Sequence, residues 1–277
     1  MKNQTFPARL HVLVAKNSKD ALVIRRGPSH VTGVFNWNRK HNSVRVAQWF
    51  KGRIYERRSD LSPDGKHWIY FAMNGKWQSE AKGAWTAIAR APWLKAIALF
   101  PKGDCWQGGG LFLDDKHYWL NGAACHSVLK QTTEVIADNT FQPSTYYNAE
   151  CLGVYFVRLQ RDGWTLEPGG KNVRLDSETL FNKHLKKQWQ LRKICHGQIG
   201  QPQGKSVYWD EHVLFNHHGD NFSKPDWEWA EYVDENIYYA EKGCLYKLPI
   251  LTASKLGEPA LVHDFNAYSF ENLQAPY

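Results

Sequence analysis

The sequence has few cysteines and no long apolar run. Its 277 residues include 5 Cys, an odd number with no Cys-x-x-Cys spacing, which argues against a disulfide framework and against a structural zinc site. No apolar run approaches the roughly 18 residues that span a bilayer. The first residues, Met1 to Arg9, have no apolar signal core. We therefore expect a cytoplasmic protein.

Recognised catalytic and cofactor motifs are also missing. The sequence has no Gly-x-Ser-x-Gly and no His-Glu-x-x-His. Gly108, Gly109 and Gly110 are not followed by the Lys and the helix that a phosphate-binding loop requires. We expect no cofactor and no metal, and we favour a protein that is not an enzyme. A glycoside hydrolase stays open, because Asp and Glu are plentiful and a pair of them could be catalytic.

A turn motif followed by aromatic and branched residues recurs along the chain. Its anchors are separated by 44 to 51 residues, and they are Asp20, Asp64, Asp115, Asp162, Asp210 and Gly257. This period is the length of one four-stranded propeller blade. We therefore predict an all-β propeller of five or six blades, with six favoured by the six anchors. It would form a single domain over residues 1–277, with the chain ends meeting at closure. A two-sheet β-sandwich is the alternative.

The best copy of the motif runs from Leu61 to Phe71 and begins Leu-Ser-Pro-Asp-Gly-Lys. It resembles the repeat of TolB-type propellers, in which a Ser-Pro-Asp-Gly-Lys turn leads into an apolar strand. Proline presets the first turn angle, aspartate bonds back to the backbone, and glycine accepts positive φ. The resemblance covers about eleven residues of one blade and implies a fold, not an activity.

Local patterns predict individual elements. Leu10–Val14 and Ala21–Ile24 favour a β-hairpin, and Leu152–Leu159 favours a strand. A short helix is expected over Asp176–Leu185, with Asp176 or Ser177 as its cap. Four cysteines are spaced almost like the repeat, which predicts a small buried residue at equivalent strand positions; these are Cys105, Cys151, Cys195 and Cys244.

Two groups near the C-terminus are candidate binding residues. Trp227 and Trp229 fall on one side of an alternating strand, where they serve as blade core or as an aromatic platform for a sugar or a peptide. The densest polar cluster contains His212, His217, His218 and Asp220. Metal ligation by this cluster would require residues 216–220 to form a loop, and an exposed turn near the propeller mouth is the simpler interpretation.

Positive charge is concentrated at the start of the chain. Residues 1–60 hold 13 Lys and Arg against 3 Asp and Glu. The candidate basic patch is made of Arg39, Lys40, Arg53, Arg57 and Arg58. Such a surface could bind nucleic acid or an acidic partner, and it could equally be a solvated strand face or assist ring closure.

The sequence therefore supports three functional hypotheses. The first is a non-catalytic binding or scaffolding protein with a protein partner, which contacts its ligand through aromatic and basic loops at one mouth. The second is a carbohydrate-active propeller, either lectin-like or a hydrolase. The third is nucleic-acid association through residues 1–60. No membrane partner is expected.

Overall fold

The structure, a computed structural model, describes residues 6–27, 30–143, 147, 150–168, 177–198 and 200–277. It contains two compact units. One comprises Met1–Tyr146, Glu150–Arg158 and Tyr268–Tyr277, and the other comprises Tyr147–Ala149 and Leu159–Ala267. The single domain over residues 1–277 is a claim about how these units associate, and it stays a prediction.

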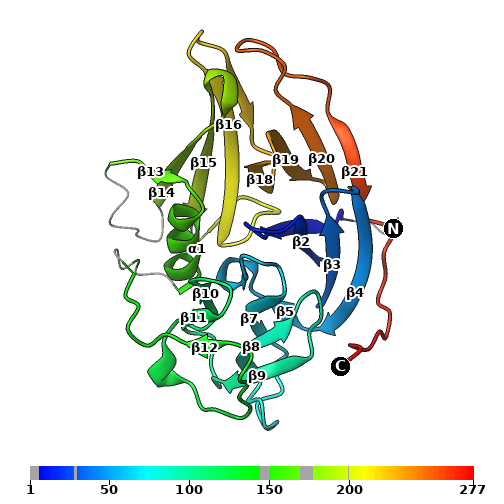
Figure 1. Ribbon diagram of the computed structural model, residues 1–277, viewed down its shortest axis with the longest axis vertical. Coiled ribbons are helices and arrows are strands. Elements are labelled where there is room, and N and C mark those ends of the chain that lie inside the picture. Colours follow the sequence, from blue (N-terminus) through cyan, green and yellow to red (C-terminus); the bar gives the residue numbers. More distant parts are fainter. Residues whose placement is uncertain (1–5, 28–29, 144–146, 148–149, 169–176, 199) are drawn as a thin grey trace. The chain divides into compact units, whose positions relative to one another are not determined.

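Sheet A opens the first unit and is a four-stranded antiparallel meander (Figure 1). Its strands are β1 (Arg9–Val14), β2 (Asp20–Arg26), β3 (Val31–Asn38) and β4 (Ser43–Lys51). Val14 pairs with Ala21 across the first turn, so the predicted hairpin is confirmed. Most side chains of β2 and β3 are buried, because both faces of these central strands are covered.

Sheets B and C complete the strands of the first unit. Sheet B contains β5 (Arg53–Ile54), β6 (Asp60–Leu61), β7 (His67–Met73), β8 (Ala84–Arg90) and β9 (Ala96–Pro101). Sheet C contains β10 (Gly110–Phe112), β11 (His117–Leu120) and β12 (Ile136–Ala137). The pairing of β11 with β12 is parallel. Two short 3₁₀ turns, η1 (Glu56–Arg58) and η2 (Ala123–Cys125), connect these strands.

Sheets D and E form the second unit. Sheet D contains β13 (Thr165–Leu166), β14 (Ser177–His184), β15 (Trp189–Gly197), β16 (Tyr208–Asn216) and β17 (Asn221–Lys224). Sheet E contains β18 (Trp229–Val233), β19 (Asn236–Glu241), β20 (Cys244–Pro249) and β21 (Ala260–Asp264). A 3₁₀ turn, η3 (Lys186–Gln188), joins β14 to β15. In both sheets the strands follow chain order and are antiparallel, so the ladder hydrogen bonds of each sheet are made within one continuous stretch of chain.

The all-β class is confirmed by these five consecutive sheets of three to five strands. The repeat itself is only partly regular. Asp20 begins β2 directly after the β1–β2 turn, Asp64 lies in the turn between β6 and β7, and Asp115 lies in the turn between β10 and β11. Asp162 instead precedes β13, and Asp210 lies inside β16. Blade count and ring closure therefore stay predictions. In the described part of the chain, no helix has the length and apolar character needed to cross a bilayer.

The Ser-Pro-Asp-Gly-Lys turn has the internal bonds that its residues predict. The Asp64 carboxylate accepts hydrogen bonds from the Ser62 hydroxyl at 2.7 Å and from the Lys66 N–H at 3.0 Å. Gly65 has a φ of +77°, which a residue with a Cβ rarely adopts. The turn delivers the chain into β7, where Trp68 and Tyr70 stack with ring centroids 4.2 Å apart in the buried core.

The strand predicted over Leu152–Leu159 is wrong, because this segment belongs to helix α1 (Glu150–Arg161). Its buried residues include Cys151, Leu152, Tyr155 and Leu159, which recur at helical spacing. Valines and aromatics favour a strand locally, but an apolar run of this length does not distinguish a strand from a buried helix.

The short helix predicted over residues 176–185 is also wrong. Residues 177–184 form β14, which pairs with β15 along its whole length, from Ser177 opposite Gly197 to His184 opposite Gln190. Thr179 and Phe181 are buried, while Glu178 is exposed, so the burial follows a strand period. Cross-strand pairing outweighs the capping signal. The proposed cap Asp176 lies outside the described residues.

The four regularly spaced cysteines do not occupy equivalent strand positions. Cys105 is exposed in a loop, Cys151 is buried on α1, Cys195 is buried on β15, and Cys244 begins β20. None of the five cysteines takes part in a disulfide bond. Their spacing therefore does not follow the blade repeat.

Candidate ligand-binding site

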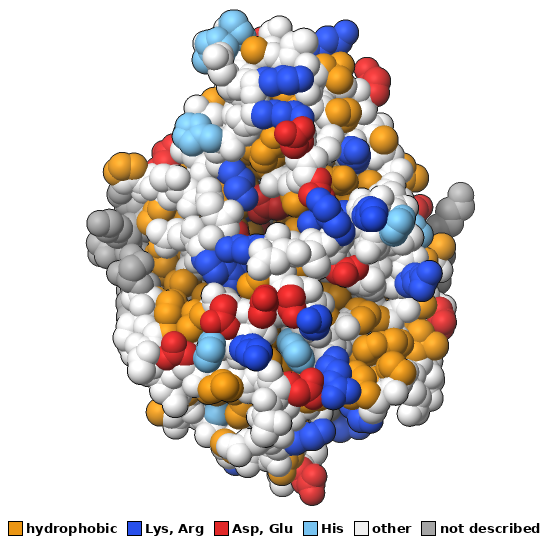
Figure 2. All heavy atoms as spheres, in the orientation of Figure 1, with side chains coloured by type: hydrophobic (Ala, Val, Ile, Leu, Met, Phe, Trp, Pro, Cys, Tyr) orange, Lys and Arg blue, Asp and Glu red, His pale blue; other side chains and the backbone are white. Residues whose placement is uncertain are grey.

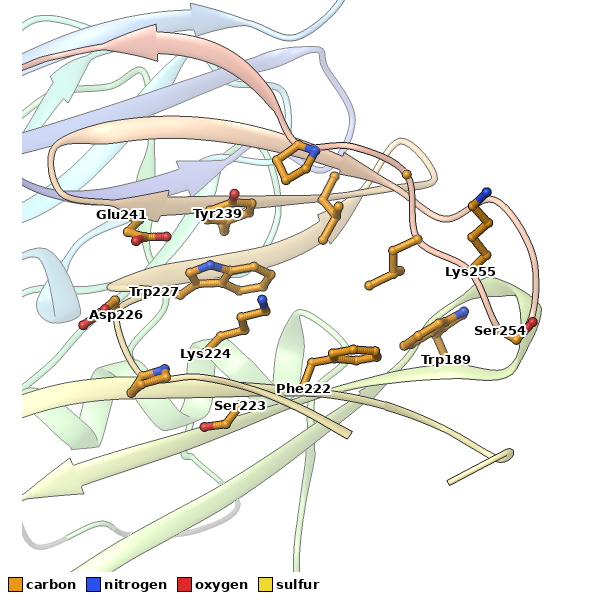
Figure 3. A pocket seen from close by; sticks show the side chains of 15 residues that line it. Trp189, Phe222, Ser223, Lys224, Asp226, Trp227, Tyr239, Glu241, Ser254 and Lys255 are labelled. Carbon is orange, nitrogen blue, oxygen red and sulfur yellow. The ribbon is translucent and has the colours of Figure 1, made fainter. Parts of the chain in front are cut away.

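A pocket of about 550 Å³ lies in the second unit, where β17 at the edge of sheet D faces sheet E (Figure 3). Its walls combine aromatic and aliphatic side chains with a similar amount of polar surface, including four charged side chains. They include Trp189, Phe222, Lys224, Asp226, Trp227, Tyr239, Glu241, Leu248, Lys255 and Leu256. Aromatic rings and convergent polar groups that line one pocket are features found in ligand sites.

Trp227 and Tyr239 line the sheet E side of the pocket, and they belong to a column of three stacked rings that Tyr246 completes outside the lining. Trp227 lies on Tyr239 with centroids 4.0 Å apart and planes 13° from parallel, and Tyr239 lies on Tyr246 at 5.1 Å. Burial and, less strongly, the charge of Glu241 raise the pKa of Tyr239 to about 12. The phenol therefore stays neutral at physiological pH and can act as a hydrogen-bond donor. The column is preformed, because each ring fixes the orientation of the next.

The sheet D wall combines a buried and an exposed aromatic ring. Trp189 is 1% exposed, and its indole N–H donates a 2.9 Å hydrogen bond to the carbonyl of Thr252. Phe222 on β17 is 42% exposed, and its ring centroid lies 6.1 Å from that of Trp189. A large apolar ring exposed at the rim of a pocket offers contact area to a ligand.

Charged groups of both signs are distributed along the pocket. The Lys224 ammonium lies 5.6 Å from the centroid of the Trp227 ring, within cation–π range. Asp226 and Glu241 lie beside Trp227 at one end of the pocket, and Lys255 lies at the other end (Figure 3). A ligand would therefore meet both carboxylates and the Lys224 ammonium beside Trp227, and the Lys255 ammonium at the other end.

His212 lies outside the pocket lining and is hydrogen-bonded to the backbone of the lining residue Trp227. Its ring is fully buried, and Nδ1 lies 2.9 Å from the carbonyl oxygen of Trp227. Because a carbonyl only accepts, Nδ1 carries the proton, and Nε2 accepts from the Lys193 ammonium 2.8 Å away. Lys193 also lies 4.9 Å from the centroid of the Trp164 ring. Of the predicted polar cluster, His212 thus contacts a pocket residue, through the backbone of Trp227.

The other predicted polar residues lie away from the pocket. His217 and His218 are exposed in the four-residue turn between β16 and β17, in which Gly219 has a φ of +92°. Asp220 accepts a 2.8 Å hydrogen bond from the side-chain amide of Asn216. The turn is the exposed loop that the sequence suggests. Among the described residues, no group of three or more His, Cys, Asp or Glu is placed to hold a metal ion.

The second predicted tryptophan, Trp229, packs into sheet E without lining the pocket. It is 5% exposed and pairs with Ala240 across the β18–β19 ladder. The two tryptophans are both buried as expected, and Trp227 alone of the two lines the pocket.

Three of the five predicted basic residues are buried within the first unit. Arg39 is bonded to backbone carbonyls of Ser18 and Asp20. Arg57 pairs with Glu56 at 3.4 Å. Arg58 donates to the carbonyls of Cys105 and Gln107. Two remain on the surface, Lys40 and Arg53, and basic and acidic side chains are interspersed over much of the face drawn in Figure 2. The structure does not gather the five into one exposed patch.

Sequence reasoning identified Trp227 but missed Trp189, Phe222 and Tyr239. Trp189 and Tyr239 lie in strands whose sequences resemble ordinary blade core. Phe222 carried the most useful signal, because it is the one apolar residue in the short polar segment Asn221–Lys224. Pairing that segment with residues 212–215 would have placed Phe222 on the face of the buried Leu214.

Comparisons with known proteins give little to add to this geometry. No family model matches the chain, and no curated protein matches it. Among solved structures, the hydrazine synthase of Kuenenia stuttgartiensis aligns with 90% of this chain and 78% of its own, at 8% identity and a TM-score of 0.30. A similarity of this size carries no argument about fold or function.

Proposed function

We propose that this chain is a propeller-like, non-catalytic binding protein, and that its ligand site is the aromatic pocket of the second unit. The observation that supports this function is the preformed wall of Trp227 and Tyr239 facing the exposed ring of Phe222. Rigid aromatic walls bind a ligand at low entropic cost, because few side-chain rotamers need to be fixed.

The propeller part of the proposal rests on sheet order and turn chemistry. Five sheets follow one another along the chain, as the blades of a propeller do. The turn Ser62–Lys66, which resembles the TolB-type repeat, has the expected Asp64 and Gly65 geometry. Five sheets favour five blades over six, with contacts to a partner made by loops at one mouth.

The proposed site can be tested by filling the pocket. Leu256→Trp places a large ring in the lining, whereas Leu251→Trp makes the same change at a residue 45% exposed outside the lining. Peptide and glycan arrays probed with the wild type and both variants compare the three proteins on identical ligands. For any compound that binds the wild type, we expect the affinity of the Leu256→Trp variant to be at least about tenfold lower. The affinity of the Leu251→Trp variant should equal that of the wild type. Equal binding by all three proteins would place the site elsewhere.

A carbohydrate-active protein is the second candidate, and one observation favours it. Asp226 and Glu241 both line a pocket with an aromatic wall, and paired carboxylates beside aromatic rings are suited to sugars. Hydrolysis of aryl glycosides that disappears in both Asp226→Asn and Glu241→Gln would establish a hydrolase. Binding on a glycan array without turnover would support a lectin-like protein instead.

A further inference from the structure

The pocket adjoins an open sheet edge. In the described part of the chain, β17 pairs with β16 on one side and with no strand on the other. Open edges present unpaired backbone groups to which a further extended chain can bond. The rim of the pocket is therefore both an apolar surface and a row of main-chain donors and acceptors.

The hairpin register shows which backbone groups point outward. The N–H of Asn216 donates to the carbonyl of Asp220 at 3.2 Å, so this is a hydrogen-bonded pair. Pairs alternate along an antiparallel ladder. Asn221 and Ser223 therefore occupy non-hydrogen-bonded pairs with β16, and their N–H and C=O groups face away from it.

The side chains of β17 divide between its two faces. Phe222 and Lys224 lie opposite Leu214 and His212, which are buried. The side chains of Phe222 and Lys224 project into the pocket, whereas the side chain of Ser223 points the other way (Figure 3). A peptide added along β17 would have the same alternation, so every second side chain of it would face the pocket.

We infer that β17 and the aromatic pocket together bind an extended peptide by strand addition. This inference rests on the proposed binding function and names its ligand class. The peptide bonds through its main chain to Asn221 and Ser223, and it places an aliphatic or aromatic side chain against Phe222 and Trp227. A Lys or Arg two positions along meets Asp226 and Glu241, of which Glu241 also pairs with Lys242 at 3.4 Å.

The size of the edge sets the expected affinity. β17 has four residues, of which Asn221 and Ser223 face outward, so at most about four main-chain hydrogen bonds can form. With one anchored side chain, such a contact buries little surface and binds weakly. The interaction is therefore suited to reversible recognition.

The probe is an array of seven-residue peptides with Lys at position six and Phe, Trp, Leu or Asp at position four. We expect binding to the Phe, Trp and Leu series and at least about tenfold weaker binding to the Asp series, since an aspartate gives little apolar contact with Phe222 and Trp227. Binding to the Asp series as strong as to the Phe series would overturn the inference.

The protein variants separate backbone from side-chain recognition. Ser223→Pro removes the outward N–H, at an edge position where proline costs no ladder hydrogen bond. Ser223→Ala keeps the N–H and removes only the hydroxyl. We expect at least about a tenfold loss of affinity for Ser223→Pro and less than about twofold for Ser223→Ala. Equal affinity in the two variants would show that no strand forms.

A second measurement does not depend on the folding of a variant. N-methylation of the best peptide, one amide at a time, should abolish binding at every second position only, because alternate amides face β17. Uniform tolerance of methylation would contradict strand addition.

The outcomes also separate the inference from the proposed function. If Leu256→Trp abolishes binding and Ser223→Pro does not, the pocket remains the ligand site and strand addition is wrong. Binding of a glycan and of no peptide would overturn the peptide class alone. No binding by the wild type on either array would remove the inference and the proposed site together.

Discussion

The Nζ atom of Lys193 lies 2.8 Å from Nε2 of His212, and both side chains are buried in sheet D. This pair supports the pocket from behind, because the other nitrogen of His212 is bonded to the backbone of Trp227. A lysine ammonium is accommodated there by a neutral imidazole and by the face of Trp164.

Removing one member of this pair should lower the free energy of unfolding more than removing both members. We expect His212→Leu to lower the free energy of unfolding by about 3 kcal/mol, because it takes an acceptor from a buried cation. The double variant Lys193→Met with His212→Leu should recover at least half of that loss. Urea unfolding of the four proteins gives the cycle, and additive losses would show that the two residues are not coupled.

Two glycines with the same backbone conformation provide a matched test of packing. Gly109 and Gly75 have φ values of +73° and +71°. A Cβ at Gly109 would lie 2.0 Å from the carbonyl oxygen of Arg58, whereas nothing lies within 4 Å of one at Gly75. We expect Gly75→Ala to cost about 1 kcal/mol from the backbone alone, and Gly109→Ala about 3 kcal/mol. Similar unfolding free energies for the two variants would contradict the close packing at η1.

Glu134 gives the first unit a specific pH dependence. Hydrogen bonds from Arg90, and then from His67, lower its pKa from 4.5 to about 2. Because the pKa is lower in the folded state, the stabilisation is complete above about pH 4.5 and is lost as the pH falls toward about 2. The side chain is one-third exposed, so we expect Glu134→Gln to cost at most about 1 kcal/mol at pH 7. Unfolding at pH 7 and at pH 2.5 should show the difference shrinking, and a constant difference would contradict the assignment.

The phenol of Tyr277 joins two backbone groups of sheet B. It accepts from the N–H of Arg90 at 3.0 Å and donates to the carbonyl of Lys95 at 2.7 Å. We expect Tyr277→Phe to lower the free energy of unfolding by about 1 kcal/mol, and Tyr277→Ala by about 2 kcal/mol, because the alanine also loses the ring that faces Arg90. Thermal unfolding gives both values. Wild-type stability in both variants would mean that the C-terminal residues do not pack as described.

Nucleic-acid association through residues 1–60 stays a proposal with a narrow basis. Lys40 and Arg53 are the exposed members of the predicted patch. If they make the contacts, the slope of log affinity against log salt should be no steeper than about −2, because each phosphate contact contributes about −0.9. Filter binding of a duplex between 20 and 200 mM salt, roughly the range in which such contacts weaken, measures this slope. A slope of about −5 or steeper would mean that more basic residues than these two contact phosphates.

The sequence predicted those parts of the fold that local chemistry decides. The hairpin of β1 and β2 and the Asp64–Gly65 turn follow from residues near one another in the chain. The strand β14 does not follow from its own residues, because they include helix-capping residues and the strand forms by pairing with β15. The helix α1 was missed because its apolar residues fit either period over a short length.

The candidate site was predictable only in part, for a related reason. Trp227 stands out in the sequence, but its partners Tyr239, Phe222 and Trp189 come from three different strands. No local pattern brings them together, since sheet order and register decide which rings meet. The role of His212 as an anchor depends on one backbone carbonyl 15 residues away.

The stacked column of Trp227, Tyr239 and Tyr246 gives the pocket an intrinsic spectroscopic signal. Chromophores this close exchange excitation, so the column should contribute an exciton couplet to the ultraviolet circular dichroism. A guest that tilts either outer ring would alter that signal without any label or dye.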